Sequence, residues 1–288
     1  MTTHRLTALI TCIVATLLLS ASPAFAADPP MYRKVALKSA PAHLIIPAGA
    51  PKAANKLNLL VHFKGGADAL AKSFLDAKLD GVLLVIHWNG LSKIYSKPFI
   101  DNPNLLEEIL DEARNAARKE GVLTADGDWD KLRTSCFSAG WASIRELLKD
   151  KKWFDRIDTI LAADSIYAGF VNDDATKRQV SPDNMKDFRR FAELAAEGKK
   201  TFIVTHSQEK TPSYASTREC AEDLIQHLKL KREEADEMRK DGTHITSRAG
   251  KGSFQVIGCA GVGESGHMLH LTRISQWWAL LAAGAPSR

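Results

Sequence analysis

Cysteine and long apolar runs are both scarce in this 288-residue sequence, which contains four cysteines. So few cysteines exclude a small disulfide-rich scaffold. Cys12 lies in the amino-terminal segment, which we expect to be removed, so Cys136, Cys220 and Cys259 remain. An odd number leaves at least one free thiol. If a pair forms, we expect Cys220 with Cys259, because the position of Cys136 suits another role.

The only long apolar run lies near the amino terminus. Residues 1–26 combine one arginine, an apolar stretch and the small-residue pattern Ala24-Phe25-Ala26. This pattern predicts a signal peptide that is cleaved after Ala26, and therefore a periplasmic or extracellular protein. No later segment approaches the roughly 20 apolar residues that span a bilayer. We expect no stable membrane span after processing.

The sequence also lacks a basic cluster interleaved with aromatic residues. Its net charge is +5, but the densest charged stretch, residues 228–251, mixes both signs and contains no aromatic residue. A nucleic-acid site needs clustered basic residues together with stacking rings. We therefore expect no nucleic-acid partner and predict a solvated helix and loop over 228–251. The oligomeric state is not indicated.

Strand-length apolar runs alternate with helical patterns along most of the chain. Continuous apolar runs of this length are typical of strands buried on both faces of a parallel sheet. The predicted strands cover 57–63, 81–88, 132–137, 157–164, 200–206 and 253–260. The predicted helices cover 104–120, 139–151, 184–198, 216–230 and 271–284. The alternation predicts one α/β domain over 27–288, with helices on both faces of a mostly parallel sheet. Residues 168–184 lack a period, so we expect a short lid or pocket wall there.

A glycine-rich stretch, GCAGVGESGH, follows the last predicted strand. Gly261, Gly263 and Gly266 have the spacing of a dinucleotide-binding loop. That site also needs an acidic residue about 20 positions later, and the sequence has no Asp or Glu after Glu264. His267 and His270 have a metal-ligand spacing, but no third ligand accompanies them. We expect neither a cofactor nor a metal.

The stretch RTSCFSAGWASIRELL predicts a sharp turn from a strand into a helix. Ser138 has the small Cys136 two residues before it and Gly140 two residues after it. Small residues are needed at both positions where a nucleophilic serine occupies a strained turn of this kind. The helix start points amide hydrogens at the reaction centre. An ordinary serine at a helix N-cap is the alternative interpretation.

Two further turns complete a candidate acyl-transfer site. In VHFKGGADAL, a strand ends in glycines ahead of a helix, where a second oxyanion donor is expected beside the amide of Ala139. Gly66 is the candidate, with Lys64 and Gly65 as alternatives. A plain strand-to-helix turn would also fit.

Asp164 ends the predicted strand 157–164, which follows the predicted helix 139–151. A carboxylate at this place can orient a histidine ring. Glu209, after the next strand, is the rival acid, and Asp173 and Asp174 are weaker rivals. A helix cap or a surface aspartate is the alternative role of Asp164.

The base must follow both residues in the chain if the order is Ser, Asp, His. His267 stands on the glycine-rich loop and is preferred over His270, which begins the next predicted helix. The other strand-end histidines, His62, His87 and His206, are expected to be structural, although His206 could face the pocket. Trp88 and Trp141 fall near the same edge of the predicted sheet and could form an aromatic wall of the site, but we expect them to pack in the core.

From about Leu57 onward these motifs resemble the α/β-hydrolase fold family. The resemblance implies a secreted serine esterase that acts on a small-molecule or polymeric ester, with Ser138 as nucleophile, His267 as base and Asp164 as acid. Ala139 and the HFKGG turn would supply the oxyanion hole. Cys136 replaces the usual elbow glycine, and the acid comes one strand earlier than is common. A non-catalytic binding protein on the same scaffold is the alternative.

Overall fold

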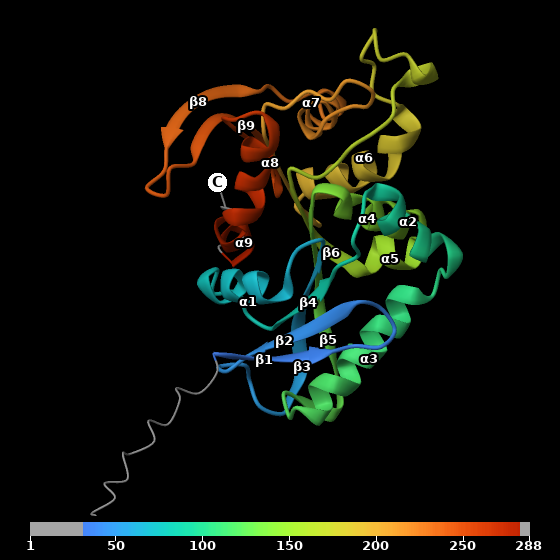
Figure 1. The fold of residues 1–288 in the computed structure, drawn as a ribbon, viewed down its shortest axis with the longest axis vertical. Coiled ribbons are helices and arrows are strands. Elements are labelled where there is room, and N and C mark those ends of the chain that lie inside the picture. Colours follow the sequence, from blue (N-terminus) through green and yellow to red (C-terminus); the bar gives the residue numbers. More distant parts are fainter. Residues whose placement is uncertain (1–30, 283–288) are drawn as a thin grey trace, which may run out of the picture. The chain divides into compact units, whose positions relative to one another are not determined.

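One ten-stranded sheet organises the computed structural model, which describes residues 31–282. The predicted signal peptide over 1–26 lies outside the described residues. The sheet order is β1-β2-β4-β3-β5-β6-β7-β10-β9-β8 (Figure 1). In chain order the strands are β1 (Tyr32–Ala36), β2 (Ala42–Pro47), β3 (Ala54–Phe63), β4 (Val82–Ile86), β5 (Leu123–Phe137), β6 (Ile157–Ala163), β7 (Thr201–His206), β8 (Glu233–Met238), β9 (His244–Lys251) and β10 (Phe254–Cys259).

The centre of the sheet is parallel and its edges are antiparallel. Strands β4, β3, β5, β6, β7 and β10 pair in parallel, and all five residues of β4 are buried. The β1–β2 hairpin extends one edge, and the β8–β9 hairpin extends the other. This confirms the predicted α/β fold, because strands with helices on both faces read as continuous apolar runs.

Helices cover both faces of the sheet. The helices are α1 (Ala67–Asp76), α2 (Ser92–Asp101), α3 (Leu105–Lys119), α4 (Trp141–Lys149), α5 (Lys151–Arg156), α6 (Pro182–Ala196), α7 (Thr217–His227), α8 (Gly263–Thr272) and α9 (Ile274–Ala282), with 3-10 turns η1 (Ser138–Gly140) and η2 (Val171–Asp173). Residues of α1, α8 and α9 pack in one apolar cluster, and residues of α2 to α7 pack in another. The alternating side chains of each central strand point into the two clusters in turn.

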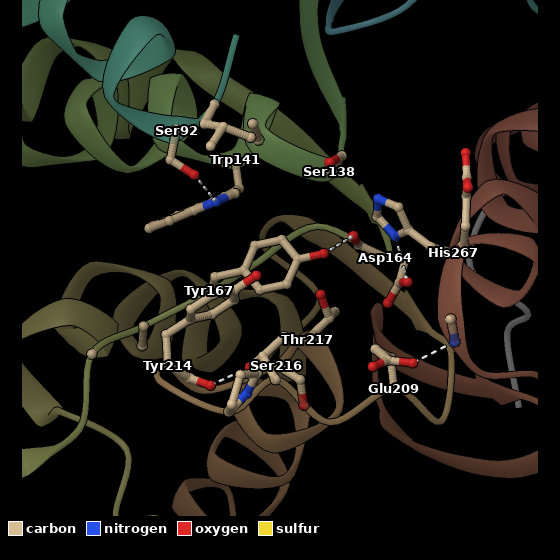
Figure 2. A pocket seen from close by; sticks show the side chains of 18 residues that line it. Ser92, Ser138, Trp141, Asp164, Tyr167, Glu209, Tyr214, Ser216, Thr217 and His267 are labelled. Carbon is tan, nitrogen blue, oxygen red and sulfur yellow. Dashed lines mark hydrogen bonds and ion pairs between the residues drawn. The ribbon is translucent and has the colours of Figure 1, made fainter. Parts of the chain in front are cut away.

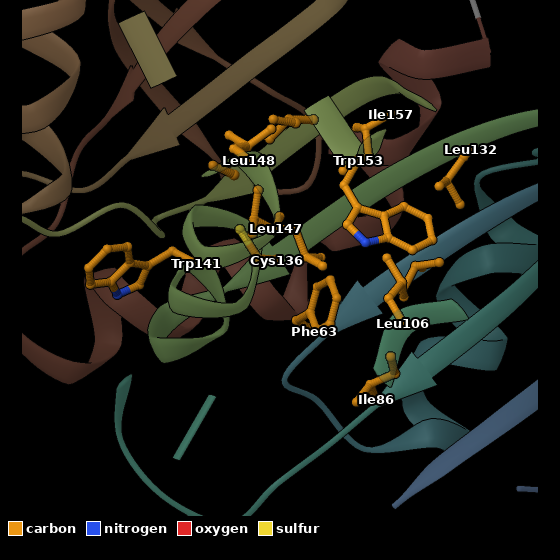
Figure 3. Close-up of a cluster of buried hydrophobic side chains, with 14 of the residues drawn as sticks. Phe63, Ile86, Leu106, Leu132, Cys136, Trp141, Leu147, Leu148, Trp153 and Ile157 are labelled. Atoms are coloured by element: carbon orange, nitrogen blue, oxygen red, sulfur yellow. The ribbon is translucent and has the colours of Figure 1, made fainter. Parts of the chain in front are cut away.

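The larger cluster lies beneath the start of α4. Figure 3 shows Phe63 at the end of β3 and Cys136 near the end of β5, beside Leu147 of α4. Full burial of such an apolar side chain is worth roughly 1.5–3 kcal/mol. The strand ends that precede the candidate site are thus anchored in a close-packed core.

The charged stretch 228–251 contradicts the sequence prediction of a helix and loop. It forms the β8–β9 hairpin instead, and the residues of β9 alternate between half-buried and buried along most of the strand. Strand β8 is an edge strand, so nearly all its residues are exposed. Charged side chains on such an edge oppose pairing with another chain. Because β8 carries these charges, its sequence lacks the alternating hydrophobic pattern by which a strand is predicted.

Two predicted helices are divided, and several elements were not predicted. Residues 139–151 span η1 and α4 and reach α5, which begins after Asp150 caps the amide of Lys152. The terminal helix starts earlier than predicted, as α8, and α9 follows after Arg273. His267 therefore lies on a helix and not on a flexible loop. Strands β1 and β2 and helices α1 and α2 were not predicted.

The predicted Cys220–Cys259 disulfide is wrong. Cys136, Cys220 and Cys259 are free and buried. Cys220 on α7 belongs to the larger apolar cluster, and Cys259 at the end of β10 belongs to the smaller one. Because the sheet separates the two clusters, the two sulfur atoms cannot meet.

Among residues 31–282, no helix combines the length and the apolar character that crossing a membrane requires.

Candidate active site

Ser138 occupies a strained turn between β5 and α4. Its φ is +51°, a left-handed conformation in which non-glycine residues are uncommon. The Ser165 hydroxyl, at the end of β6, donates a hydrogen bond to the Ser138 carbonyl at 2.7 Å. Such strain costs on the order of 1–3 kcal/mol and persists where the surrounding structure holds it. The predicted elbow therefore exists as a local geometry.

The small residues around Ser138 are required by close packing. A Cβ added at Gly140 would lie 2.4 Å from the Phe63 carbonyl oxygen on β3. On the other side of the serine, Cys136 is buried in the core, and burial raises the pKa of its thiol to about 12. Cysteine thus serves here as a small apolar residue, and glycine is needed only at 140.

The buried Asp164 carboxylate contacts the half-buried His267 ring. The Asp164 Oδ2 atom lies 2.8 Å from His267 Nδ1. Ser207 donates to the same carboxylate twice, from its backbone amide to Oδ1 at 3.1 Å and from its hydroxyl to Oδ2 at 2.9 Å. The Phe137 ring stacks on the imidazole with centroids 4.5 Å apart. The ring is therefore fixed by a carboxylate at its edge and a phenyl group on its face.

The protonation of this pair follows from its contacts. Burial alone would raise the pKa of Asp164, but hydrogen bonds from His267 and the Ser207 amide outweigh burial and hold the pKa below its ordinary value. An ionised carboxylate only accepts hydrogen bonds, so the proton of a neutral His267 ring resides on Nδ1. Nε2 then presents a lone pair, as a general base requires.

The relation of Ser138 to this pair is visible in Figure 2. The imidazole of His267 lies between the Ser138 hydroxyl and the Asp164 carboxylate. All three residues line the same cavity, whose volume is ≈ 660 Å³. Among the described residues, no hydrogen bond joins the Ser138 hydroxyl to His267. Nucleophile–base contacts are often long in unliganded sites and shorten when substrate binds.

The rival acid Glu209 has another contact. Its carboxylate accepts a hydrogen bond from the Gly263 amide at the start of α8. The neighbouring Gln208 amide donates to the Gly261 carbonyl at 2.8 Å. The segment Ser207–Glu209 thus contacts both the acid and the helix that carries His267. Sequence reasoning missed Ser207, because a serine after a strand carries no distinctive signal.

His270 is not placed as a base. It is buried, its Nδ1 lies 2.7 Å from the Thr205 hydroxyl, and its ring stacks on Trp277. Burial lowers the pKa of His270 to about 4. Over residues 31–282, no group of three or more His, Cys, Asp or Glu side chains could hold a metal ion.

The weaker acid candidates, Asp173 and Asp174, do not line the cavity. Asp173 ends the turn η2, and Asp174 binds the Thr176 hydroxyl and amide. Of the predicted lid over 168–184, only Ala168 and Gly169 line the cavity.

The predicted oxyanion donors differ in availability. Ala139 lines the cavity, in keeping with its place directly after Ser138. The Lys64 amide donates to the Ile86 carbonyl at 3.0 Å, and the Gly65 amide donates to His87 Nδ1 at 3.1 Å. Within the described residues the Gly66 amide has no hydrogen-bond acceptor, and Gly66 precedes α1. Gly66 is thus the free amide of the turn, although it is not part of the cavity wall.

Buried contacts hold that turn in place. Trp278 Nε1 donates to the Ser135 hydroxyl at 2.9 Å, and this hydroxyl lies 3.1 Å from His62 Nδ1. His62 Nε2 lies 3.1 Å from the Lys64 carbonyl. The Lys64 carbonyl can only accept, so a neutral His62 ring donates to it through Nε2 and accepts the Ser135 hydroxyl proton at Nδ1. His62 is therefore structural, as expected.

Aromatic side chains form one wall of the cavity. The rings of Trp141 and Tyr167 pack edge to face with their centroids 6.2 Å apart, and the rings of Tyr167 and Tyr214 do so with their centroids 5.5 Å apart. All three residues line the cavity. Trp141 therefore lines the cavity and also belongs to the larger apolar cluster, so both interpretations of this residue apply. Trp88 packs against Tyr95 and Phe99, as expected for a core residue.

His206 does not line the cavity. It is buried, and its Nε2 lies 3.2 Å from an Arg232 amino group, which can only donate. Its Nδ1 proton then faces the Ser207 carbonyl at 2.8 Å.

The glycines of GVGESG serve packing. Gly261 has a φ of +116°, and a Cβ added at Gly266 would lie 2.5 Å from the Gly261 carbonyl carbon. The strand end and the first turn of α8 therefore approach more closely than side chains would permit. This approach places His267, the residue after Gly266, over the ends of the central strands.

No protein-family model matches the sequence, and no curated protein matches it. Solved structures with a similar chain trace include a siderophore hydrolase from Aspergillus nidulans (11% identity, 88% of this chain and 96% of that chain, TM-score 0.49). A poly(aspartic acid) hydrolase from Sphingomonas sp. KT-1 has 14% identity, with 88% and 98% covered and a TM-score of 0.49. A glucuronoyl esterase from Solibacter usitatus has 11% identity, with 86% and 79% covered and a TM-score of 0.43.

At these identities and TM-scores the similarities assign no activity to the chain. The fold rests on its own geometry. The parallel sheet, the strained serine turn after β5, and Ser138, Asp164 and His267 in that chain order are features of the α/β-hydrolase fold, which this chain has.

Proposed function

We propose that the protein is a serine hydrolase that cleaves an ester or related acyl bond through an acyl-enzyme. The observation that carries this proposal is the 2.8 Å contact between Asp164 and His267, in a cavity that also contains the strained Ser138. A buried carboxylate, an oriented imidazole and a serine hydroxyl that lines the cavity are the parts of an activated serine. A serine that merely capped a helix would need neither of the other two.

The reaction proceeds in two halves. The Ser138 oxygen attacks the acyl carbonyl while His267 Nε2 takes the hydroxyl proton. The imidazolium then gives that proton to the leaving alcohol as the carbonyl–oxygen bond breaks. Water, deprotonated by the same nitrogen, attacks the acyl-enzyme and releases the acid and free Ser138. Asp164 stays ionised throughout and stabilises the imidazolium.

Backbone amides stabilise the charged intermediate. The Ala139 amide stands at the start of the helical turn that follows the nucleophile, and the Gly66 amide is the donor without an acceptor in the opposite turn. One such donor is worth about 3 kcal/mol of transition-state stabilisation in comparable sites. Gly66 is the second donor in this proposal, and it contributes fully once its amide is within about 3 Å of the oxyanion.

The proposed substrate is a small-molecule or polymeric ester outside the cytoplasm. Export is part of the proposal and rests on the amino-terminal pattern of residues 1–26. A cavity of ≈ 660 Å³ has the size of a typical small-molecule site.

The test is intact-mass spectrometry of the protein after incubation with a fluorophosphonate. An activated serine displaces fluoride and retains the phosphonyl group. We expect one adduct on the wild type and none on Ser138→Ala or His267→Ala. His227→Ala, on α7 and paired with Glu193, is the matched control and should keep the adduct. An adduct that persists on Ser138→Ala would overturn the assignment.

A second candidate is a non-catalytic binding protein on the same scaffold. It is favoured by the lack of a Ser138–His267 hydrogen bond within the described residues. In that case the folded wild type would form no adduct, and circular dichroism would show the same thermal transition with and without the reagent. Ligand capture would then replace turnover assays.

A further inference from the structure

The charge of the cavity wall is opposite to that of the whole chain. The sequence carries a net charge of +5, but no lysine or arginine lines the cavity. Three carboxylates do: Asp164, Glu209 and Glu264. A concave site lined by one sign of charge concentrates ligands of the opposite sign.

The three carboxylates differ in how they are used. Asp164 is bound by His267 and Ser207, and Glu209 accepts from the Gly263 amide. Glu264 is exposed on the first turn of α8 and has no ion pair or hydrogen bond to another side chain in residues 31–282. Its charge is therefore available to a ligand, and that of Glu209 is only partly compensated by one amide.

Aromatic rings face this acidic side of the cavity. Figure 2 shows Tyr167 and Tyr214 below Trp141, with Ser216 and Thr217 between these rings and Glu209, and all of these residues line the same cavity. Tyr214 is 43% exposed, so much of its ring is open to the cavity or solvent. The Arg145 guanidinium, which does not line the cavity, already lies 4.4 Å from the centre of the Trp141 ring, so the rings of Tyr167 and Tyr214 are the candidates for binding a ligand cation. This wall thus has the electron-rich faces that attract cations.

We propose that the cavity binds acyl compounds that carry an ammonium group, and this substrate class rests on the proposed hydrolase function. The ammonium group lies against the Tyr214 and Tyr167 rings, and the Glu209 and Glu264 carboxylates that line the same cavity attract its charge. The rings and the carboxylates both attract a positive charge, so their effects on the ammonium group reinforce each other. Neither attraction requires an N–H donor, so a quaternary ammonium can bind as well. An anionic group at the same place would lose water and find no cationic side chain.

Two isosteric alcohols separate the charge from the shape of the ligand. Choline and 3,3-dimethylbutan-1-ol differ in a quaternary nitrogen against a quaternary carbon, and isothermal titration gives their Kd values without any turnover. We expect choline to bind about tenfold more tightly to the wild type. Equal affinities, or tighter binding of the neutral alcohol, would overturn the proposal.

Variants locate the effect. Glu264→Gln removes one charge and should reduce the choline preference about threefold, and Tyr214→Leu should reduce it without changing charge. Glu234 is an exposed residue of β8. Glu234→Gln removes the same charge as Glu264→Gln, but away from the cavity, so it should leave the choline preference unchanged. A preference that falls equally in Glu234→Gln and Glu264→Gln would show that only the net charge matters, which contradicts the proposal.

The butyrate esters of the two alcohols link binding to catalysis. A higher kcat/KM for the choline ester, lost in Ser138→Ala, supports both proposals. Hydrolysis of both esters at equal rates, together with equal Kd values, overturns only the ammonium preference. Selective choline binding by a protein that hydrolyses neither ester and forms no fluorophosphonate adduct overturns the hydrolase function and supports the cationic site.

Discussion

The carboxylate of Asp164 and the imidazole of His267 meet at 2.8 Å, although 103 positions separate the two residues in the chain. Asp164 directly follows β6 and has a positive φ, and His267 lies in the second turn of α8, beyond β10. The contact thus depends on the placement of α8 against the carboxyl ends of the strands. Glu209 does not make this contact, because its carboxylate accepts a hydrogen bond from the Gly263 amide.

Asp164→Asn should lower kcat by about 10³–10⁴, because an amide can donate to Nδ1 and favour the wrong imidazole tautomer. The measurement is kcat on an ester that the wild type cleaves. Glu209→Gln keeps an oxygen that can accept from Gly263, so its loss should stay below about tenfold. A larger loss in Glu209→Gln than in Asp164→Asn would show that the acid was misassigned.

Ser207 is expected to act as a positioning residue for Asp164. Ser207→Ala removes the hydroxyl that donates to Oδ2 at 2.9 Å but keeps the amide that donates to Oδ1. One lost hydrogen bond to a charged group is worth about 1.5 kcal/mol, so kcat should fall about tenfold. KM should not change, because Ser207 does not line the cavity.

Ser207→Thr keeps a hydroxyl and should recover most of kcat. If Ser207→Ala and Ser207→Thr lose kcat equally, or if the loss follows a lower melting temperature in both, the role of Ser207 is structural only.

The elements that could be predicted are those whose burial is uniform. Strand β4 is buried at every residue, so its apolar run identifies it without knowledge of its neighbours. The elbow was predictable because its steric requirement lies within five consecutive residues. Gly140 shows this requirement directly, through its approach to the Phe63 carbonyl.

The elements that were missed depend on partners distant in the sequence. Strand β8 carries charges on both faces because it forms the sheet edge, and its stretch therefore looks like a polar helix or loop. The roles of Ser207 and Glu209 depend on where α8 packs. Trp141 follows the elbow directly, yet its place on the cavity wall is set by the neighbouring rings of Tyr167 and Tyr214.

All thiols within residues 31–282 should be free and unreactive in the folded protein. Burial raises the pKa of Cys136 and Cys259 to about 12 and that of Cys220 well above its ordinary value, so hardly any thiolate forms at neutral pH. Iodoacetamide should modify none of the three in the native protein and all three after denaturation without reductant. Peptide mapping that finds Cys220 and Cys259 unmodified under those conditions would restore the disulfide.

Acid should destabilise the fold before the carboxylates titrate. Burial lowers the pKa of His62, His206 and His270 to about 4, whereas a histidine in the unfolded chain titrates near pH 6.5. Between these values the unfolded chain binds protons that the folded protein does not. The free energy of unfolding is therefore fully retained above about pH 6.5 and falls as the pH decreases toward 4, by up to about 3 kcal/mol for each histidine.

Urea denaturation at pH 7.5, 6.0, 5.0 and 4.5 measures how the free energy of unfolding depends on pH. Replacing one buried histidine should reduce the number of protons that are taken up on unfolding by about one. His206→Gln keeps a group that can accept from Arg232, so it should fold and reduce the slope by about one proton. His227→Gln changes an exposed ring on α7 and serves as the matched control. A free energy of unfolding that stays constant from pH 6.5 to 4.5 would mean that the three rings are not kept neutral by burial. Because Asp164 has a pKa below its ordinary value, its own contribution is lost only at still lower pH, after the histidines have titrated.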